Sequence, residues 1–202
     1  LTQDSNMPAV TDPYAALASN IPTNTCSSYP QEPGKKGTPL PSSNLLSGTK
    51  ALGTTTFCGD VQLTGNVTLT GTNVIVIRNG QLDTNGYTIK TDTGAAATII
   101  FSGDNGSYTH APTGGGIIDI AAPTSRAWSG VAIYDDPSLT TGVDISAAGN
   151  SPSWSITGLT YFPHSSITFS GAVGKATNGH SCFVMVVDTL LINGTGMILN
   201  RG

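Results

Sequence analysis

The strongest candidate for chemistry in this sequence is the acidic pair Asp135-Asp136, which Pro137 follows directly. Clustered carboxylates can hold Ca²⁺, and a bound cation can assist removal of a proton from a sugar, as carbohydrate-cleaving enzymes require. Neighbouring residues on a strand point to opposite faces, however, and Asp before Pro commonly begins a turn. Arg126 is close enough in sequence to pair with either aspartate. We therefore interpret the pair as a turn, with the cation or sugar site as the alternative.

Three histidines, His110, His164 and His180, are the other side chains that commonly bind metals or move protons. None of them has the H-x-H or H-E-x-x-H spacing of a zinc site. His164 follows a proline at an apparent corner, so we expect it to be exposed. We predict no catalytic residue, no cofactor-binding residue and no metal ligand, and therefore a protein that is not an enzyme and needs no cofactor.

The three cysteines predict one disulfide and one free thiol. Cys26 lies in a Pro-rich leader and Cys58 begins the strand-rich part of the chain, so we expect a bridge that pins one to the other. Cys182 begins an apolar strand, and we predict a buried thiol there. A disulfide in a chain rich in Ser, Thr, Asn and Gly indicates an extracytoplasmic location, in the periplasm or at the cell surface.

Composition excludes two classes of partner. The net charge is −4 and the eight Lys and Arg residues are scattered, so the basic face that nucleic acid requires is not expected. The longest apolar run, from Cys182, is cut by Asp188 and is far shorter than the roughly 20 residues that a membrane span needs. Leu1 does not open a signal-peptide pattern. We expect membrane contact only through a segment outside this chain.

The first 52 residues differ from the rest. They hold seven of the twelve prolines and little alternation, so we expect a leader that caps the sheet which follows. Asp12 suits a helix N-cap and Pro13 suits the first helical position, which predicts a short helix over 12–18. A disordered leader is the alternative. We assign residues 1–52 to a Pro-rich N-terminal cap and residues 53–202 to a strand-rich domain.

Short strands separated by Gly- and Asn-containing corners dominate this second domain. In the stretch 156–171, Leu159 and Tyr161 alternate with polar residues, and Ile167 and Phe169 do the same after a Phe-Pro-His corner. Such period-two alternation predicts strands with one buried and one solvated face. Similar runs recur from residue 54 onward without an amphipathic helix between them, which predicts an all-β fold.

Two architectures fit many short strands: a sandwich or barrel of hairpins, and a parallel β-helix. Hairpins need longer strands joined by two-residue turns, whereas these strands are short and unevenly spaced. A coil around a narrow apolar column also suits a chain with only 6% aromatic residues. We therefore predict a right-handed parallel β-helix, a single-stranded solenoid, with the Pro-rich segment and its one helix as the cap. The predicted core residues are Val61, Leu63, Leu69, Ile75, Ile77, Ile89, Ile133, Leu159, Tyr161, Ile167, Phe169, Val184 and Val186.

Several segments, in order along most of the chain, resemble the C-terminal region of TadG-type proteins, which belong to the Tad-like Flp pilus-assembly group of bacteria. The segments are D-P-Y-A (12–15), F-C-G-D-V-Q-L-T-G-N-V-T-L (57–69), W-S-G-V-A-I-Y-D-D-P (128–137), I-T-G-L-T-Y-F-P-H-S-S-I-T-F-S-G (156–171) and C-F-V-M-V-V-D-T-L-L-I-N-G (182–194). The resemblance implies an envelope protein whose hydrophobic N-terminal anchor, typical of the family, is absent from this chain. It implies no catalytic residue.

The expected function follows from that resemblance. We expect a non-enzymatic extracytoplasmic module of a Tad/Flp-type pilus assembly or adhesion system, with pilus or envelope proteins as partners and surface glycans as further candidates. The loops 103–116 and 135–153 are long enough to carry recognition. Two alternatives remain: a carbohydrate-active, pectate-lyase-like β-helix enzyme, and a stand-alone surface adhesin or filament subunit that self-associates.

Overall fold

A computed structural model describes residues 11–23, 25–32, 39–146, 153–169, 172–174, 182–192 and 197–198. Strands account for 51% of the structure and helix is almost absent, so the fold is all-β, as the composition predicts. The elements are η1 (Ala15–Asn20), η2 (Ser42–Asn44), β1 (Leu45–Lys50), β2 (Thr54–Cys58), β3 (Val61–Leu69), β4 (Thr72–Arg78), β5 (Leu82–Asp83), β6 (Thr88–Thr91), β7 (Ala96–Ser102), β8 (Pro112–Thr113), β9 (Ile117–Ala121), β10 (Val131–Asp135), β11 (Asp144–Ser146), β12 (Ser153–Phe169), β13 (Ala172–Gly174), β14 (Phe183–Ile192) and β15 (Met197–Ile198). The two described helices are short 3-10 helices of six and three residues, and neither is long or apolar enough to cross a membrane.

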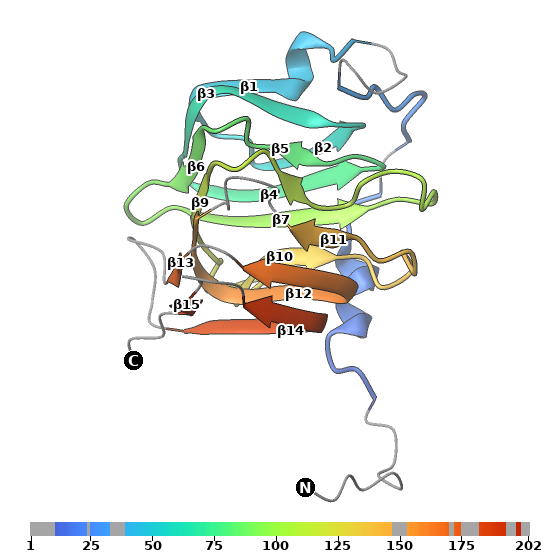
Figure 1. Ribbon diagram of the computed structural model, residues 1–202. Helices are drawn as coiled ribbons and strands as arrows, with labels where there is room; N and C mark the ends of the chain where they lie inside the picture. The colour runs from blue at the N-terminus through green and yellow to red at the C-terminus, as the bar shows by residue number, and fades with distance from the viewer. Residues whose placement is uncertain are drawn as a thin grey trace, which may run out of the picture.

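The strands form one large parallel sheet that does not close on itself (Figure 1). β2, β4, β7, β10, β12 and β14 lie side by side in this order, so that Phe57 lies beside Ile77, Ile77 beside Phe101 and Phe101 beside Asp135. Every ladder between described strands is parallel. The hairpin sandwich, which needs antiparallel neighbours, does not fit these registers.

A second row of strands continues the sheet. β3 pairs with β1, β5 and β6, and β9 pairs with β6 and β12. The long strand β12 joins the two rows, because residues 153–157 pair with β9 and later residues pair with β10, β11 and β14. The strand changes rows at Gly158, whose φ is 117°. A Cβ there would lie 2.6 Å from the Cβ of Ala122, so the bend requires glycine.

Alternate residues of neighbouring strands stack into one apolar core. Ile75 and Ile77 of β4 are buried with Ile99 and Phe101 of β7, and the Phe101 ring lies 6.0 Å from that of Phe162. Parallel registers place equivalent positions of successive strands above one another, so a period-two sequence pattern produces a continuous column. The predicted core residues that are buried in this column are Val61, Leu63, Leu69, Ile75, Ile77, Ile89, Ile133 and Ile167.

A smaller apolar cluster lies on the opposite face of the same strands, and we call it the outer cluster. Its buried members are Val76, Ile100, Trp128, Val131, Tyr134, Leu159 and Tyr161. Residues 11–23, which we call the N-terminal strap, pack against it through Tyr14 and Leu17. The Tyr161 hydroxyl donates to the carboxylate of Asp12 (2.5 Å), and the Tyr134 hydroxyl donates to the backbone carbonyl of Tyr14 (2.9 Å). These strands are therefore covered on both faces.

Five predicted core residues need separate comment. Leu159 and Tyr161 are buried, but they contact the outer cluster rather than the interior column that the sequence predicts. Val184 is 40% exposed, so the prediction that it is a core residue is wrong. Val186 is half-buried against the outer cluster. Both lie on β14, which has a described strand on one side only. The side chain of Phe169 lies outside the described residues.

The leader also differs from the prediction. β1 pairs with β3, so the strands begin at Leu45 inside the segment that the sequence assigns to the cap. The helix expected over 12–18 is the 3-10 turn η1, and the Asp12 carboxylate accepts the N–H of Tyr14 (2.9 Å) just before it. Figure 1 shows η1 beside the strands, near β10 and β12, whereas η2 lies at the end of the sheet next to β1. The strap thus covers a face rather than an end.

Candidate functional site

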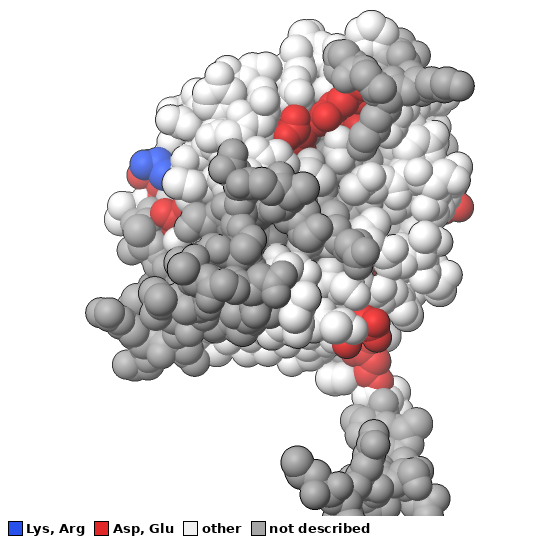
Figure 2. Space-filling model, in the orientation of Figure 1, with Lys and Arg blue, Asp and Glu red and all other residues white. Residues whose placement is uncertain are grey.

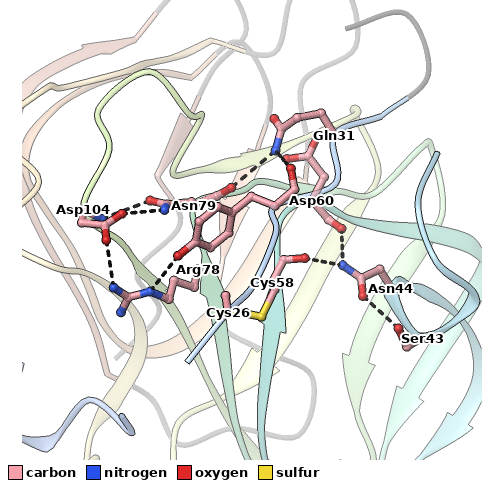
Figure 3. Close-up of a disulfide and its surroundings, with 10 residues drawn as sticks. Cys26, Gln31, Ser43, Asn44, Cys58, Asp60, Arg78, Asn79 and Asp104 are labelled. Atoms are coloured by element: carbon pink, nitrogen blue, oxygen red, sulfur yellow. Dashed lines mark hydrogen bonds and ion pairs between the residues drawn. A yellow bond between two sulfur atoms is a disulfide. The ribbon is translucent and has the colours of Figure 1, made fainter. Parts of the chain in front are cut away.

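A disulfide fastens the leader to the first strands of the sheet (Figure 3). It joins Cys26 to Cys58, the last residue of β2, with a Cα–Cα distance of 5.7 Å and 32 residues of sequence separation. Cys58 ends its strand, and Gly59 turns the chain with a φ of 81°. The leader carbonyl of Pro30 accepts the N–H of Asp60 directly after this turn (2.9 Å). Such a bridge is typical of an oxidising compartment.

Asp60, next to the disulfide, is a buried carboxylate with a structural role. It accepts the N–H of Glu32 at one oxygen (3.0 Å) and the N–H of Gln81 at the other (3.1 Å). The side-chain amide of Asn44 donates to its backbone carbonyl (2.9 Å). Since a buried carboxylate requires hydrogen-bond donors, these contacts stabilise the leader on the sheet. The sequence pattern does not single out Asp60, because its donors come from distant segments.

A second polar cluster holds the loop 103–116 against the sheet. Asn79 is fully buried with a φ of 50°, and its side-chain oxygen accepts the N–H groups of Asp104 (3.1 Å) and Asn105 (3.3 Å). The amide of Asn79 also donates to the Asp104 carboxylate (2.8 Å), which lowers the pKa of Asp104 below its ordinary value. Arg78 adds to this lowering from 3.3 Å (Figure 3). The start of this candidate recognition loop is therefore anchored.

The structure separates the two residues of the acidic pair. Asp135 is the last residue of β10, and its side chain is only 3% exposed. Burial raises the pKa of Asp135 from 3.8 to about 8, and the neighbouring Asp136 carboxylate adds to the rise. At neutral pH this carboxyl is therefore mostly protonated. Asp135 is therefore not part of the exposed turn that the sequence predicts. A sugar or a hydrated cation cannot reach a carboxyl group that is so far from solvent.

Asp136 forms the turn that the sequence predicts. Its carboxylate accepts the N–H (3.0 Å) and hydroxyl (2.7 Å) of Ser138 at one oxygen and the hydroxyl of Ser102 (3.1 Å) at the other. Its backbone carbonyl accepts the N–H of Leu139 (2.9 Å), which closes the turn. Arg126 is exposed and forms no ion pair with either of these two described aspartates.

The two described histidines, His110 and His164, do not converge on a site. His110 is buried, and this burial lowers its pKa below the ordinary value. The Tyr108 backbone and two aspartates raise the pKa, but by less. His164 is exposed as predicted, with Nε2 3.2 Å from the carbonyl of Pro137. His180 lies outside the described residues. Within the described ranges, no three His, Cys, Asp or Glu side chains are grouped so that they could hold a metal ion.

The last described long strand, β14, lies at an edge of the described sheet. Cys182, just before it, is a free and exposed cysteine, so the prediction of a buried thiol is wrong. Among the described strands β14 pairs only with β12, and Val184, Leu190 and Leu191 are 40%, 41% and 50% exposed. An apolar residue at a sheet edge is buried only if another segment covers that edge. The β14 edge is therefore a candidate interaction surface in the described structure.

The surface chemistry suits uncharged partners. In the view of Figure 2, most described atoms belong to residues that carry no charge, Asp and Glu form a few small groups, and Lys and Arg are sparse. This agrees with a chain in which 10% of residues are charged. On this face a partner would be recognised through apolar contact and hydrogen bonds more than through charge.

Comparison with known proteins yields no relative: no family model, no curated protein and no solved structure matches this chain. We therefore infer the function from the described contacts and from the sequence segments quoted above. Among the structural features, the β14 edge and the disulfide are the most informative, because both restrict where and how the chain can interact.

Proposed function

We propose that this chain is a non-enzymatic extracytoplasmic module of a Tad/Flp-type pilus assembly or adhesion system, built as a right-handed parallel β-helix. The single observation that carries the structural role is the apolar edge of β14, which among the described strands pairs only with β12. An open strand edge recruits another strand through its free backbone groups. The pilus system itself comes from the ordered resemblance to TadG-type sequences.

Two further observations support this proposal. All described ladders are parallel and link strands in successive passes of the chain, as a coil requires, and parallel crossovers are right-handed in about 98% of cases. The Cys26–Cys58 disulfide favours the periplasm or cell surface. An experimental structure with antiparallel neighbours or left-handed crossovers would contradict the β-helix.

The arrangement of the acidic pair supports a non-enzymatic role. The Asp135 side chain is withdrawn from solvent, and both oxygens of Asp136 accept hydrogen bonds from serines. The competing pectate-lyase-like function needs carboxylates that face a substrate. Turnover of pectate, polygalacturonate or alginate in the presence of Ca²⁺, abolished by Asp135→Ala or Asp136→Ala, would establish the enzyme instead.

Binding to purified Tad/Flp pili and pilus-assembly proteins tests the proposal. We expect the wild-type chain to bind, and Leu191→Lys to weaken binding at least tenfold, because a charge at the β14 edge opposes strand addition. Ile117→Lys is the matched control, since Ile117 is also exposed (42%) but lies on β9, which is paired on both sides. Absence of binding, or equal loss in both variants, refutes the edge as the binding surface. Binding to surface glycans alone would favour the stand-alone adhesin.

A further inference from the structure

Asn-Gly pairs are places where a chain can change its own covalent structure. Glycine has no side chain to shield its backbone nitrogen, so this nitrogen can attack the side-chain amide carbon of the preceding asparagine. The part of the chain that the structure describes contains three such pairs, Asn79-Gly80, Asn85-Gly86 and Asn105-Gly106. The reaction requires an accessible amide, a glycine nitrogen that is free to turn towards it, and space for the ring that forms. The structure meets these requirements differently at the three pairs.

Packing and hydrogen bonds protect Asn79-Gly80. Asn79 is fully buried, and its side-chain amide donates to the Asp104 carboxylate (2.8 Å). Its side-chain oxygen accepts two backbone N–H groups of the loop 103–116. A Cβ built at Gly80 would lie 2.2 Å from the backbone of Gly59, so this glycine cannot move without displacing its neighbour. Ring closure at this pair therefore requires local unfolding.

A backbone hydrogen bond protects Asn85-Gly86, although Asn85 is exposed. The N–H of Gly86 donates to the carbonyl of Gly114 (2.8 Å), which fixes the direction of the attacking nitrogen. The side-chain amide of Asn85 donates to the carbonyl of Leu63 (3.3 Å). Both reacting groups must leave their partners before they can meet, so this pair also reacts only after a local opening.

Asn105-Gly106 meets all three requirements. Both residues are exposed, which leaves space for the ring, and the N–H of Gly106 has no acceptor among the described residues. The side-chain oxygen of Asn105 accepts the N–H of Ser107 (2.9 Å). This oxygen gains negative charge when the glycine nitrogen adds to the amide carbon, so the Ser107 N–H stabilises the transition state. The amide of Asn105 is therefore both accessible and polarised.

We propose that Asn105 is a site of spontaneous deamidation within the candidate recognition loop. The Gly106 nitrogen gives its proton to solvent and forms a bond to Cγ of Asn105. The bond from Cγ to Nδ2 then breaks, and Nδ2 takes a proton from solvent and leaves as ammonia. Water opens the resulting succinimide at either carbonyl and gives aspartate or isoaspartate. The net change is hydrolysis of one amide, so the reaction needs no oxidant, reductant or enzyme.

The product places a second negative charge next to Asp104. Arg78 already forms an ion pair with Asp104 at 3.3 Å, so the two carboxylates would share one cation. The loop therefore becomes more acidic as the protein ages, in a chain of which only 10% of the residues are charged. This inference does not depend on the pilus function, because the reaction involves neither the β14 edge nor a partner.

Incubation of the folded chain at mildly alkaline pH, followed by tandem mass spectrometry, tests the proposal. Electron-transfer fragmentation locates each converted residue and distinguishes isoaspartate from aspartate. We expect Asn105 to convert at least about tenfold faster than Asn79 and Asn85, because only the latter two must first break native contacts. In guanidinium chloride these contacts are lost, so the three rates should agree within about threefold.

Asn105→Gln is the matched variant, since it keeps the side-chain amide but lengthens the side chain by one methylene. Ring closure then loses its favourable geometry, so conversion at position 105 should slow at least about tenfold while thermal unfolding stays unchanged. An unchanged rate in this variant would exclude attack by the Gly106 nitrogen. Equal rates at the three pairs in the folded chain, or conversion of Asn105 only in guanidinium chloride, would overturn the proposal.

Discussion

Removal of the Cys26–Cys58 disulfide should cost a large and calculable part of the stability. The bridge closes a loop with a sequence separation of 32. The chain-entropy relation then gives a loss of about 12 cal/mol/K in the unfolded state, or about 3.7 kcal/mol at 25 °C. The leader keeps its other contacts to the sheet through Asp60 and Asn44. The double variant Cys26→Ala/Cys58→Ala should therefore still fold, and the free energy of unfolding should fall by about 3–4 kcal/mol.

Urea denaturation of the wild type and the variant measures this difference by linear extrapolation. The slope of the free energy of unfolding against urea should rise in the variant, because an unfolded chain without the cross-link exposes more surface. Cys182→Ser is the control: the thiol is exposed and free, so the change should stay within about 0.5 kcal/mol.

A loss below about 1 kcal/mol in the double variant, or a loss equal to that of Cys182→Ser, would refute the entropic reasoning. Thiol counting offers a direct check of the bridge itself. Under denaturing, non-reducing conditions one sulfur should react, and three reactive sulfurs would show that the bridge is absent.

Three further predictions concern buried polar groups. Asp135, with its pKa raised from 3.8 to about 8, keeps its proton in the folded state and loses it on unfolding, so the free energy of unfolding should fall by about 1.4 kcal/mol per pH unit between pH 4 and 8. Asp135→Asn should remove this slope in urea titrations, and an unchanged slope would contradict the assigned burial. His110 has a lowered pKa, so its contribution to the free energy of unfolding is present above pH 6.5 and is lost as the pH falls below that value. His110→Gln should make the free energy of unfolding fall less steeply with acid, and an equally steep fall would exclude His110 as the cause. Tyr161→Phe removes the hydroxyl that donates to Asp12, so hydrogen exchange of the strap amides should become about tenfold faster or more. The control Tyr87→Phe changes an exposed tyrosine and should leave this exchange unchanged, and equal exchange rates in both variants would show that this hydrogen bond does not hold the strap.

Much of the fold could be predicted because strand patterns are local. Apolar residues at alternate positions, such as Val61 and Leu63, are buried in the column as expected. The Asp136 carboxylate forms the expected turn before Pro137, because Asp accepts the N–H two residues further on in any surrounding. These predictions depend on neighbours within a few residues, and the sequence contains all of them.

The candidate sites were predicted less well because they depend on distant segments. Cys182 and Val184 have the pattern of a buried strand, yet both are exposed, since burial needs a covering segment that β14 lacks among the described residues. Asp135 has the pattern of a surface turn, yet it is buried where β10 lies beside β7. The strap reaches the outer cluster through hydrogen bonds from Tyr134 and Tyr161, which lie more than a hundred residues away in sequence.

The sequence by itself determined that the chain forms short strands with alternate burial, because period-two patterning acts within each strand. Only the tertiary structure decided which apolar face turns inward. Ile75 and Ile77 lie in the column as the sequence predicts, whereas Leu159 and Tyr161, which have the same alternating pattern, lie with Val76 in the outer cluster. The outward face is then buried by the N-terminal strap, so Leu159 and Tyr161 are as well covered as the interior. The physical reason is that alternation fixes two faces of a strand, while the partners available in space decide what each face contacts.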